Sequence, residues 1–503
     1  MNTLNSLLRS FILLLFLTGA TKTGYGQSWQ WAKGEGDIGN DAAFGVTVDD
    51  AGNSYVTGNI AGRADFSGTI YQGSGIYDLF VAKYGPNGDL LWVKLGGGPG
   101  NDQGNSIKWS NGYLYVCGSF EGTATFSGTT LTSKGEGDMF LAKYGDGGNL
   151  IWIRSGGGTG LDYGQTVDVG SNGDVLVGGA YETAMKLESV NLTTTNIYYE
   201  SFYARYGSTG NLIWAKSTSG NNPNMVTGLA FDHNNALYIT GYFGGSLRAD
   251  NTTVNSVSSS YDIFLAKVSE GDGSLTWIKR AGSLYEDAGH AVTCDLQGNP
   301  TITGYFAGTA SFDGNQVTYN DYNDIFTARY DANGNNLWVR AGKGLQLDVP
   351  FAITSDATGN LFVTGMFQGA IDFDGNALTG GDREVFVVSY DNNGALRWLA
   401  QAGGSDTDCW LGIAVSGNGS LLLCGYYVHT GMFGNVPVDY ASGTDLFIAK
   451  YSPPPVGINN LSVDLDVVLY PNPSRDNCVL KAGFNTTGCT YTLNNQLGAA
   501  LYT

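Results

Sequence analysis

The sequence predicts an all-β fold: a seven-bladed β-propeller closed by its N-terminal strand and followed by a small partial β-sandwich tail. Three observations predict it. Glycine supplies 76 of the 503 residues and aromatic residues make up 13%, a composition typical of strands joined by tight turns. Segments of alternating apolar residues surround Gly/Asn/Asp turns, which predicts hairpins. The third observation is an internal repeat of about sixty residues.

Three sequence markers recur seven times in one phase. The first is a tryptophan, found at Trp31, Trp92, Trp152, Trp214, Trp277, Trp338 and Trp398. The second is an acid two residues before a phenylalanine, found at Asp78, Asp138, Glu200, Asp262, Asp324, Glu384 and Asp445. The third is a glycine, found at Gly58, Gly118, Gly179, Gly241, Gly304, Gly365 and Gly425. Three independent markers in one phase exclude a chance match.

Each repeat predicts four strands, which we call A to D. In the first unit strand A ends near 46–50 and strand B covers 54–60. A connection of some 17 residues follows, and then come strand C at 79–84 and strand D at 89–94. A unit this short cannot bury its own core, so the units must stack. Antiparallel four-stranded units that repeat radially form the blades of a propeller.

The two ends of the repeat predict that the ring closes. The stretch 28–33, "SWQWAK", is a strand D without a preceding strand C. The stretch 446–451, "LFIAKY", is a strand C whose strand D is replaced by "SPPPVG" at 452–457. Pairing of these two stretches would leave no free sheet edge. We therefore expect deletion of 28–33 to destabilise the ring strongly.

The pattern "GNxYVxGxF…DxFxAKYxxxGxxxWxK" resembles the bacterial SBBP-type seven-bladed β-propeller repeat family over residues 29–451. The third and fourth units depart from it, with Glu200 in place of Asp and Val268 in place of Tyr. The resemblance implies a propeller and an exported location. It implies no single activity.

Both ends of the chain predict export. Residues 1–26 carry Arg9 and the apolar run "FILLLFL", which predicts a signal peptide cleaved after Gly26. The predicted propeller covers 27–451 and a linker covers 452–460. No later stretch is long and apolar enough for a membrane-spanning helix.

The tail at 461–503 carries "YPNPSRDNCVL" and resembles the C-terminal sorting domain of type IX secretion. It departs from that family by stopping at Thr503, before the expected final strands and basic end, so either the sequence is truncated there or the domain is incomplete. The resemblance implies the type IX secretion machinery as a partner. It also implies a location outside a Gram-negative cell or on its surface.

The net charge and the spacing of the cysteines limit the classes of partner and ligand that the protein is expected to bind. A formal charge of −20 without a basic cluster repels nucleic acid and anionic membranes. The six cysteines form no CxxC pair and no zinc spacing. Cys117 and Cys424 fall at buried strand positions. Cys478 and Cys489 are the pair in the tail, where a disulfide and two free thiols both stay open.

An acidic face is the predicted binding site. Aspartates precede strand A in the D-to-A connections, at Asp41, Asp102, Asp162, Asp287, Asp348 and Asp408, with Asn224 in the remaining unit. The acid that begins each strand C would lie on the same face, together with the long B-to-C connections. One interpretation is a binding surface for a cation, with calcium as the candidate cofactor, or for a basic or sugar partner. The other is that turn carboxylates accept backbone N–H bonds, which the repetition favours.

No catalytic residue stands out. His233, His290 and His429 fall at different repeat positions, and no nucleophile, zinc or phosphate motif has its structural context. The repeated tryptophans favour packing between blades over sugar stacking, whereas Trp109 and Trp410 lie outside the repeat and are candidates for blade-specific contacts. The predicted function is an exported, non-enzymatic scaffold that binds a protein or glycan. The alternative is a glycan-active enzyme that uses a carboxylate pair of the acidic face.

Overall fold

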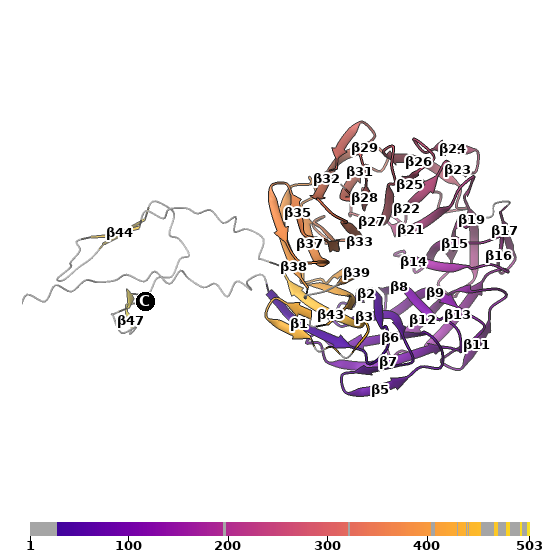
Figure 1. The fold of residues 1–503 in the computed structure, drawn as a ribbon, viewed down its shortest axis with the longest axis horizontal. Coiled ribbons are helices and arrows are strands. Elements are labelled where there is room, and N and C mark those ends of the chain that lie inside the picture. The colour runs from indigo at the N-terminus through magenta and orange to yellow at the C-terminus, as the bar shows by residue number, and fades with distance from the viewer. Residues whose placement is uncertain are drawn as a thin grey trace, which may run out of the picture. The chain divides into compact units, whose positions relative to one another are not determined.

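The computed structural model confirms an all-β propeller. It describes residues 28–194, 198–319, 322–403, 408–429, 431–438, 440 and 442–453, together with the backbone of four short strands in the tail. The propeller unit runs from Trp29 to Ser452. Every regular element in these ranges is a strand, and the sheets stand radially around a central axis (Figure 1).

Each radial sheet contains four antiparallel strands in the predicted order. The inner strands are β2 (Ala42–Val48), β8 (Gln103–Ser110), β14 (Tyr163–Val169), β21 (Asn224–Phe231), β27 (Ala288–Cys294), β33 (Val349–Ser355) and β39 (Cys409–Val415). The second strands are β3 (Ser54–Ile60), β9 (Tyr113–Phe120), β15 (Val175–Tyr181), β22 (Leu237–Gly244), β28 (Pro300–Phe306), β34 (Leu361–Phe367) and β40 (Leu421–Tyr427).

The outer half of each sheet is the hairpin that the repeat predicts. The third strands are β6 (Asp78–Tyr84), β12 (Asp138–Gly145), β18 (Glu200–Tyr206), β25 (Tyr261–Val268), β31 (Asp324–Tyr330), β37 (Glu384–Tyr390) and β43 (Asp445–Ser452). The fourth strands are β7 (Leu90–Gly97), β13 (Leu150–Gly156), β19 (Leu212–Ser217), β26 (Leu275–Gly282), β32 (Asn336–Gly344), β38 (Leu396–Ala402) and β1 (Ser28–Glu35). The second and third strands are almost wholly buried, because both faces of each sheet pack against neighbouring sheets.

The predicted closure of the ring is confirmed. The N-terminal strand β1 pairs with β43 in the sheet β1-β43-β40-β39, so the indigo and yellow ends of the propeller lie side by side in Figure 1. Trp29 on β1 packs against Trp410 and Tyr451, with ring centroids 5.3 and 4.9 Å apart. An aromatic cluster thus joins the first strand to the last sheet.

The B-to-C connections differ from the prediction, which treated them as loops on one face. Each folds into a short hairpin: β4 (Arg63–Phe66) with β5 (Thr69–Gln72), β10 (Thr123–Phe126) with β11 (Thr129–Thr132), β16 (Ala184–Leu187) with β17 (Val190–Thr193), β23 (Ser246–Ala249) with β24 (Thr252–Asn255), β29 (Thr309–Phe312) with β30 (Asn315–Thr318), β35 (Ala370–Phe373) with β36 (Asn376–Thr379), and β41 (Gly431–Phe433) with β42 (Val436–Val438). Hairpins such as β10–β11 pair with the outer strand of the preceding sheet. They therefore cover outer edges, which would otherwise be open to strand addition.

The number of sheets also differs from the seven predicted. Among the described residues, eight sheets have three or more strands. The additional sheet is β20-β23-β24, in which β20 is the pair Ser219–Gly220. It arises because the outer strand of the third unit is interrupted at Thr218, which separates β19 from β20.

The repeated tryptophans join neighbouring blades. The indole N–H of Trp31 donates to the carbonyl of Pro86 in the C-to-D turn of the next blade (3.0 Å), and Lys450 Nζ donates to the same oxygen (3.1 Å). The same convergence of an indole and a lysine occurs at Ser208 and at Ala332. The lysine and the tryptophan of the motif "AKYxxxGxxxW" therefore both bind the C-to-D turn of the next blade.

Glycine in the same turn completes that contact. Gly88 has a φ of +82°, and a Cβ there would lie 2.8 Å from the ring of Trp31. The turn therefore needs a residue that adopts the left-handed region and has no side chain. Within the described residues, Trp398 Nε1 has no acceptor, and the stretch that corresponds to the acceptor turn begins at Ser452 and lies mostly outside those residues.

The tail is described only as two strand pairs. Strand β44 (Val467–Tyr470) pairs with β45 (Val479–Ala482), and β46 (Leu493–Asn494) pairs with β47 (Ala500–Tyr502). The predicted signal peptide, most of the linker, and both Cys478 and Cys489 lie outside the described residues. Across the described part of the chain, no helix is long and apolar enough to cross a membrane.

Candidate functional site: the central channel

The predicted acidic ring is buried. The side chains of Asp41, Asp102, Asp162, Asp287, Asp348 and Asp408 are at most 2% exposed. Asp102 accepts the backbone N–H of Gly98 (2.7 Å) through Oδ2 and that of Glu121 (3.1 Å) through Oδ1. Asp41 and Asp287 likewise each bind two backbone amides. These carboxyl groups fix the D-to-A turns and offer no exposed oxygens to a ligand.

Burial changes the protonation of this ring. Loss of solvation penalises the charged form and raises the pKa of Asp102 to about 6 and that of Asp348 to about 8. The pKa values of Asp41, Asp162 and Asp287 rise to about 7 for the same reason. The acid that begins strand C of the same sheet adds to the effect, as Asp78 does for Asp102. The two predicted acidic rings therefore lie next to each other, but their carboxyl groups are buried in the protein and do not face solvent.

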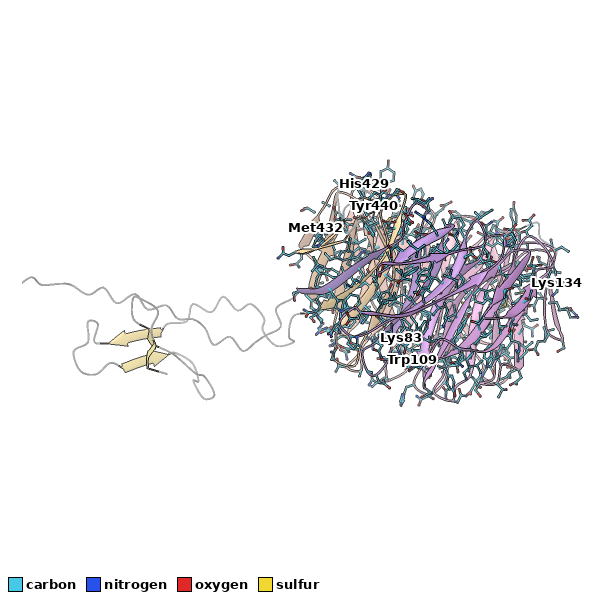
Figure 2. All side chains as sticks on the ribbon, turned by 90° about the horizontal axis from the view of Figure 1, so that it is seen from below. Lys83, Trp109, Lys134, His429, Met432 and Tyr440 are labelled. Carbon is cyan, nitrogen blue, oxygen red and sulfur yellow. The ribbon has the colours of Figure 1, made fainter. Side chains whose placement is uncertain are left out.

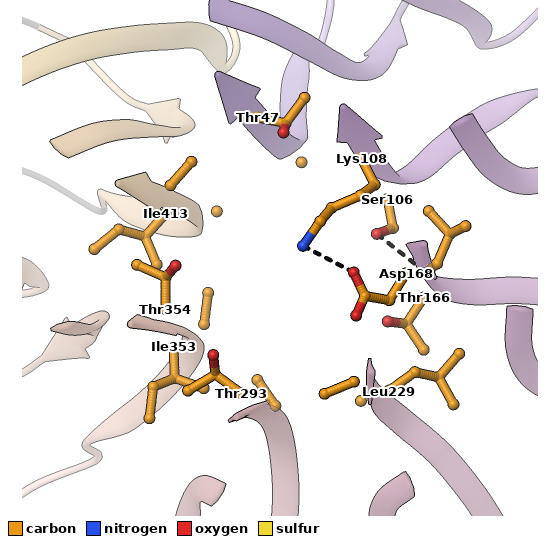
Figure 3. A pocket seen from close by; sticks show the side chains of 18 of the residues that line it. Thr47, Ser106, Lys108, Thr166, Asp168, Leu229, Thr293, Ile353, Thr354 and Ile413 are labelled. Carbon is orange, nitrogen blue, oxygen red and sulfur yellow. Dashed lines mark hydrogen bonds and ion pairs between the residues drawn. The ribbon is translucent and has the colours of Figure 1, made fainter. Parts of the chain in front are cut away.

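The site that is open to a ligand is the central channel. Its cavity volume is about 650 Å³, and residues of all the inner strands line it. Figure 3 shows side chains from these strands directed toward one another around the opening. A cavity of this size lies within the range of small-ligand sites.

Each inner strand carries a β-bulge that places one extra residue in this lining. In β2 the register shifts between Ala43 and Gly45, which leaves Phe44 as the extra residue. The same shift occurs in every inner strand. The resulting set, which we call the bulge ring, comprises Phe44, Asn105, Gln165, Thr227, His290, Phe351 and Leu411. Bulges re-aim side chains and are common at functional sites.

The bulge ring is chemically divided. Asn105, Gln165, Thr227 and His290 come from consecutive strands and form a polar arc, whereas Phe351, Leu411 and Phe44 come from the remaining strands and form an apolar arc. All are partly exposed. The seven equivalent backbone positions therefore carry six different residue types, with phenylalanine at two of them.

The polar arc is held by the backbone of neighbouring blades. Asn105 Nδ2 donates to the carbonyl of Gly164 (2.9 Å), and Thr227 Oγ1 donates to that of Gly289 (2.7 Å). His290 Nδ1 lies 2.7 Å from the carbonyl oxygen of Pro350. Because a carbonyl only accepts, Nδ1 is the donor in this pair.

The apolar arc borders a small hydrophobic cluster. Phe351 and Leu411 pack against the buried side chains of Val349, Met366 and Cys409. The ring of His290 stacks on Phe351 with centroids 6.0 Å apart and planes at 21°. His290 therefore lies at the boundary between the two arcs.

An ion pair joins the neighbouring inner strands β8 and β14 inside the channel, three residues farther along each strand from the bulge ring. Lys108 Nζ lies 2.8 Å from Asp168 Oδ1, and Figure 3 shows both side chains extending into the opening. Attraction by Asp168 raises the pKa of Lys108. Asp168 Oδ2 also accepts the backbone N–H of Phe231 (2.8 Å), so this carboxylate is fixed on two sides.

The other candidates from the sequence do not join this site. His233 and His429 are exposed, and in Figure 2 His429 and Tyr440 lie on the opposite side of the propeller from Lys83 and Trp109. Trp410 is buried in the core cluster of the last sheet. Trp109 is the exception: it lines the channel cavity and stacks on Tyr55 with ring centroids 5.1 Å apart. Of the three histidines, His290 alone lines the channel.

Sequence reasoning missed the bulge ring, although a signal for it exists. Each of these residues follows the in-phase Asp or Asn by three positions, as Phe44 follows Asp41 and Thr227 follows Asn224. Its variation within an otherwise repeated segment is the signal. The search for repeated residues directed attention to the aspartates instead.

The described residues show no arrangement that supports thiol or metal chemistry. Cys117, Cys294, Cys409 and Cys424 are free thiols, and burial raises the pKa of each. A raised pKa disfavours the reactive thiolate. No group of three or more His, Cys, Asp or Glu within the described ranges is arranged to hold a metal ion.

Comparison with known proteins supports the fold class at low identity. No family model matches the chain. An uncharacterized WD repeat-containing protein, L264 of Acanthamoeba polyphaga mimivirus, is 22% identical over 372 residues, which are 59% of this chain and 27% of that protein. The regulatory protein FlaEY of Caulobacter vibrioides is 27% identical over 250 residues, which are 44% of this chain and 24% of that protein. The chain thus spans about a quarter of the length of these curated relatives.

Solved structures with a similar arrangement are distant. The WD40 β-propeller domain of Doa1 has a TM-score of 0.44 and 11% identity, with 85% of this chain and 97% of that domain covered. A quinohemoprotein alcohol dehydrogenase from Comamonas testosteroni has a TM-score of 0.40 and 11% identity, with 87% and 78% covered. At these values neither structure carries an argument about function.

Proposed function

We propose that the protein is an exported, non-enzymatic scaffold that binds a ligand at the bulge ring of its central channel. The observation that carries this proposal is the division of that ring into a polar and an apolar arc on otherwise repeated strands. A repeat that served only packing would keep equivalent positions alike, as it does for the tryptophans. Side chains that differ at one height of a channel are what a ligand-specific site requires.

The burial of the acidic ring bears on the enzymatic alternative. Glycoside hydrolysis needs two carboxyl groups that face the substrate across several ångströms. Asp102 and its equivalents instead face backbone amides inside the turns. The proposal therefore assigns them a structural role and places binding in the channel.

Export and delivery belong to the same proposal. Residues 1–26 resemble a signal peptide, and 461–503 resemble a type IX sorting domain. We propose secretion to the cell surface or the medium of a Gram-negative bacterium by that route. Fusion of residues 1–26 and 461–503 to a reporter protein tests it: the reporter should appear outside the cell only with both segments.

A ligand-observed NMR screen tests the binding role. The mature protein should produce saturation transfer to at least one class in a library of saccharides, short peptides and amines. The variant Phe351→Ala should abolish that signal, because it removes the aromatic side chain at the edge of the polar arc. Substitution of the exposed Tyr322, Tyr322→Ala, is the control and should leave it unchanged. Absence of binding to every class would contradict the proposal.

Calcium binding is tested separately. If the aspartates of the D-to-A turns held calcium, the melting temperature would rise with added calcium in the wild type and less so in Asp102→Asn and Asp162→Asn. With both groups occupied by backbone amides, we expect calcium and EDTA to leave the melting temperature of all three proteins unchanged.

A further inference from the structure

The polar arc exposes hydrogen-bond acceptors to the channel. Asn105 uses one amide hydrogen on Gly164, Thr227 uses its hydroxyl hydrogen on Gly289, and His290 uses its Nδ1–H on Pro350. The acceptors left for a ligand are the carbonyl oxygen of Asn105, the lone pairs of the Thr227 hydroxyl, and Nε2 of His290, and the second amide hydrogen of Asn105 is left as a donor. Burial lowers the pKa of His290, so Nε2 carries a lone pair at neutral pH. A ligand at this arc must therefore bring several donors.

Gln165 adds a group that both donates and accepts. No hydrogen bond to its side chain is present within the described residues, although it lines the cavity between Asn105 and Thr227. The side-chain amide can turn to suit the ligand. The arc thus offers acceptors at Asn105, Thr227 and His290, and the side-chain amides of Asn105 and Gln165 can also donate.

The opposite arc offers apolar surface. Phe351, Leu411 and Phe44 line the same cavity and present no hydrogen-bonding side-chain group. A ligand that satisfies both arcs has hydroxyl-type donors on one edge and C–H groups on the other. A pyranose ring has this division, with its hydroxyl groups at the edge and its C–H face apolar.

The charged groups around the channel favour a neutral ligand over a charged one. The bulge ring contains no carboxylate and no ammonium or guanidinium group, so it offers no ion pair to an amine or an acidic sugar. The single cation of the channel, Lys108, is already paired with Asp168. The net charge of −20 further disfavours anions.

We propose that the bulge ring binds the terminal residue of a neutral saccharide, with its hydroxyl edge on the polar arc and its apolar face on Phe351 and Leu411. This inference rests on the proposed binding role and names the ligand class. It does not involve the repeated tryptophans, whose indoles donate to the turns of neighbouring blades. The Lys108–Asp168 pair lies beyond the sugar and limits how far the chain end enters.

A glycan array of neutral, acidic and amino sugars, followed by calorimetry with the best neutral sugar, tests the inference on the mature full-length protein. The variant Gln165→Ala should weaken binding at least tenfold, because it deletes an adaptable hydrogen-bonding group. It should not change the melting temperature, because that side chain makes no internal hydrogen bond. The matched control is Gln316→Ala on the exposed face of β30, which should bind like the wild type.

The outcomes separate this inference from the broader function. Neutral sugar binding that falls with Gln165→Ala and survives Gln316→Ala supports it. Binding only of acidic or amino sugars, or of a peptide in the NMR screen, overturns the ligand class while the scaffold role stands. Sugar binding that is unaffected by both Gln165→Ala and Phe351→Ala overturns the location. No binding to any class contradicts both proposals.

Discussion

Deletion of residues 28–33 should open the ring and cost more free energy than any single substitution discussed here. The deletion removes most of β1, which supplies the outer strand of the last sheet. The single side chain of Trp29 contacts Trp410, Phe433 and Tyr451. Loss of a large aromatic side chain from such a cluster costs about 3–5 kcal/mol when the side chain is fully buried. Because Trp29 is only partly buried, we expect about 2–4 kcal/mol for Trp29→Ala and more for the deletion, which also removes the pairing with β43.

Urea unfolding of the mature protein, followed by circular dichroism near 215 nm, measures this difference. Trp31→Phe is the control: it keeps the strand and removes the indole hydrogen bond to Pro86, at a cost of about 1 kcal/mol. Size-exclusion chromatography should also show association of the deletion variant, since the exposed edge of β43 can pair with another chain. A deletion variant that unfolds at the same urea concentration as the wild type and stays monomeric would refute the role of β1 as a latch.

Three further predictions follow from the buried groups. The folded-state pKa values of the turn aspartates lie near 6 to 8, above the usual 3.8. The contribution of these carboxyl groups to the free energy of unfolding is therefore complete below about pH 4 and is lost as the pH rises through their folded-state pKa values of 6 to 8. The loss amounts to up to about 1.4 kcal/mol per pH unit for each carboxyl. Melting temperatures that rose from pH 5 to pH 8 would contradict this. Asp348→Asn should be neutral or stabilising at pH 8, because Oδ2 of Asp348 has no hydrogen-bond partner among the described residues. Asp102→Asn should instead cost about 1–3 kcal/mol, because it leaves a backbone amide unsatisfied; equal effects of the two substitutions in chemical unfolding would be evidence against the assignment. Trp338→Phe should destabilise by about 1 kcal/mol more than Trp398→Phe, because the first indole donates to Asn392 (3.2 Å) and the second has no acceptor in the described part of the chain, and parallel urea titrations will show whether the two differ.

The sequence predicted the strands and the closure because both depend on local pattern and phase. Alternation around the turn at 145–149 defines the hairpin of β12 and β13, and the unmatched segments at 28–33 and 446–451 define the closing pair. The outer hairpins were missed because strands of four residues, such as Thr123–Phe126, alternate too briefly to be distinguished from a loop. Their pairing with the preceding sheet is a tertiary contact that no local pattern encodes.

The candidate site was predicted poorly for a different reason. A charged residue near a glycine-rich turn suggests an exposed surface, yet Asp102 is buried because two backbone amides take the place of water. The bulge at Asn105 depends on the register between β8 and β9. A single strand does not reveal that register, since the bulge appears only when the partner strand is aligned with it.

The contrast between repeated and unrepeated positions separates the two kinds of constraint in this chain. Positions that bind the blades to one another, such as Trp152 and its acceptor turn at Ser208, meet the same requirement in each unit and so keep the same residue. A position three residues after the turn aspartate faces the channel, where the units meet at one shared cavity. A ligand in this cavity would meet each unit from a different direction, so the side chains that contact it need not be alike. Three members of the ring, Phe44, Gln165 and His290, occupy equivalent backbone positions and differ in chemistry, as side chains that surround one bound ligand would.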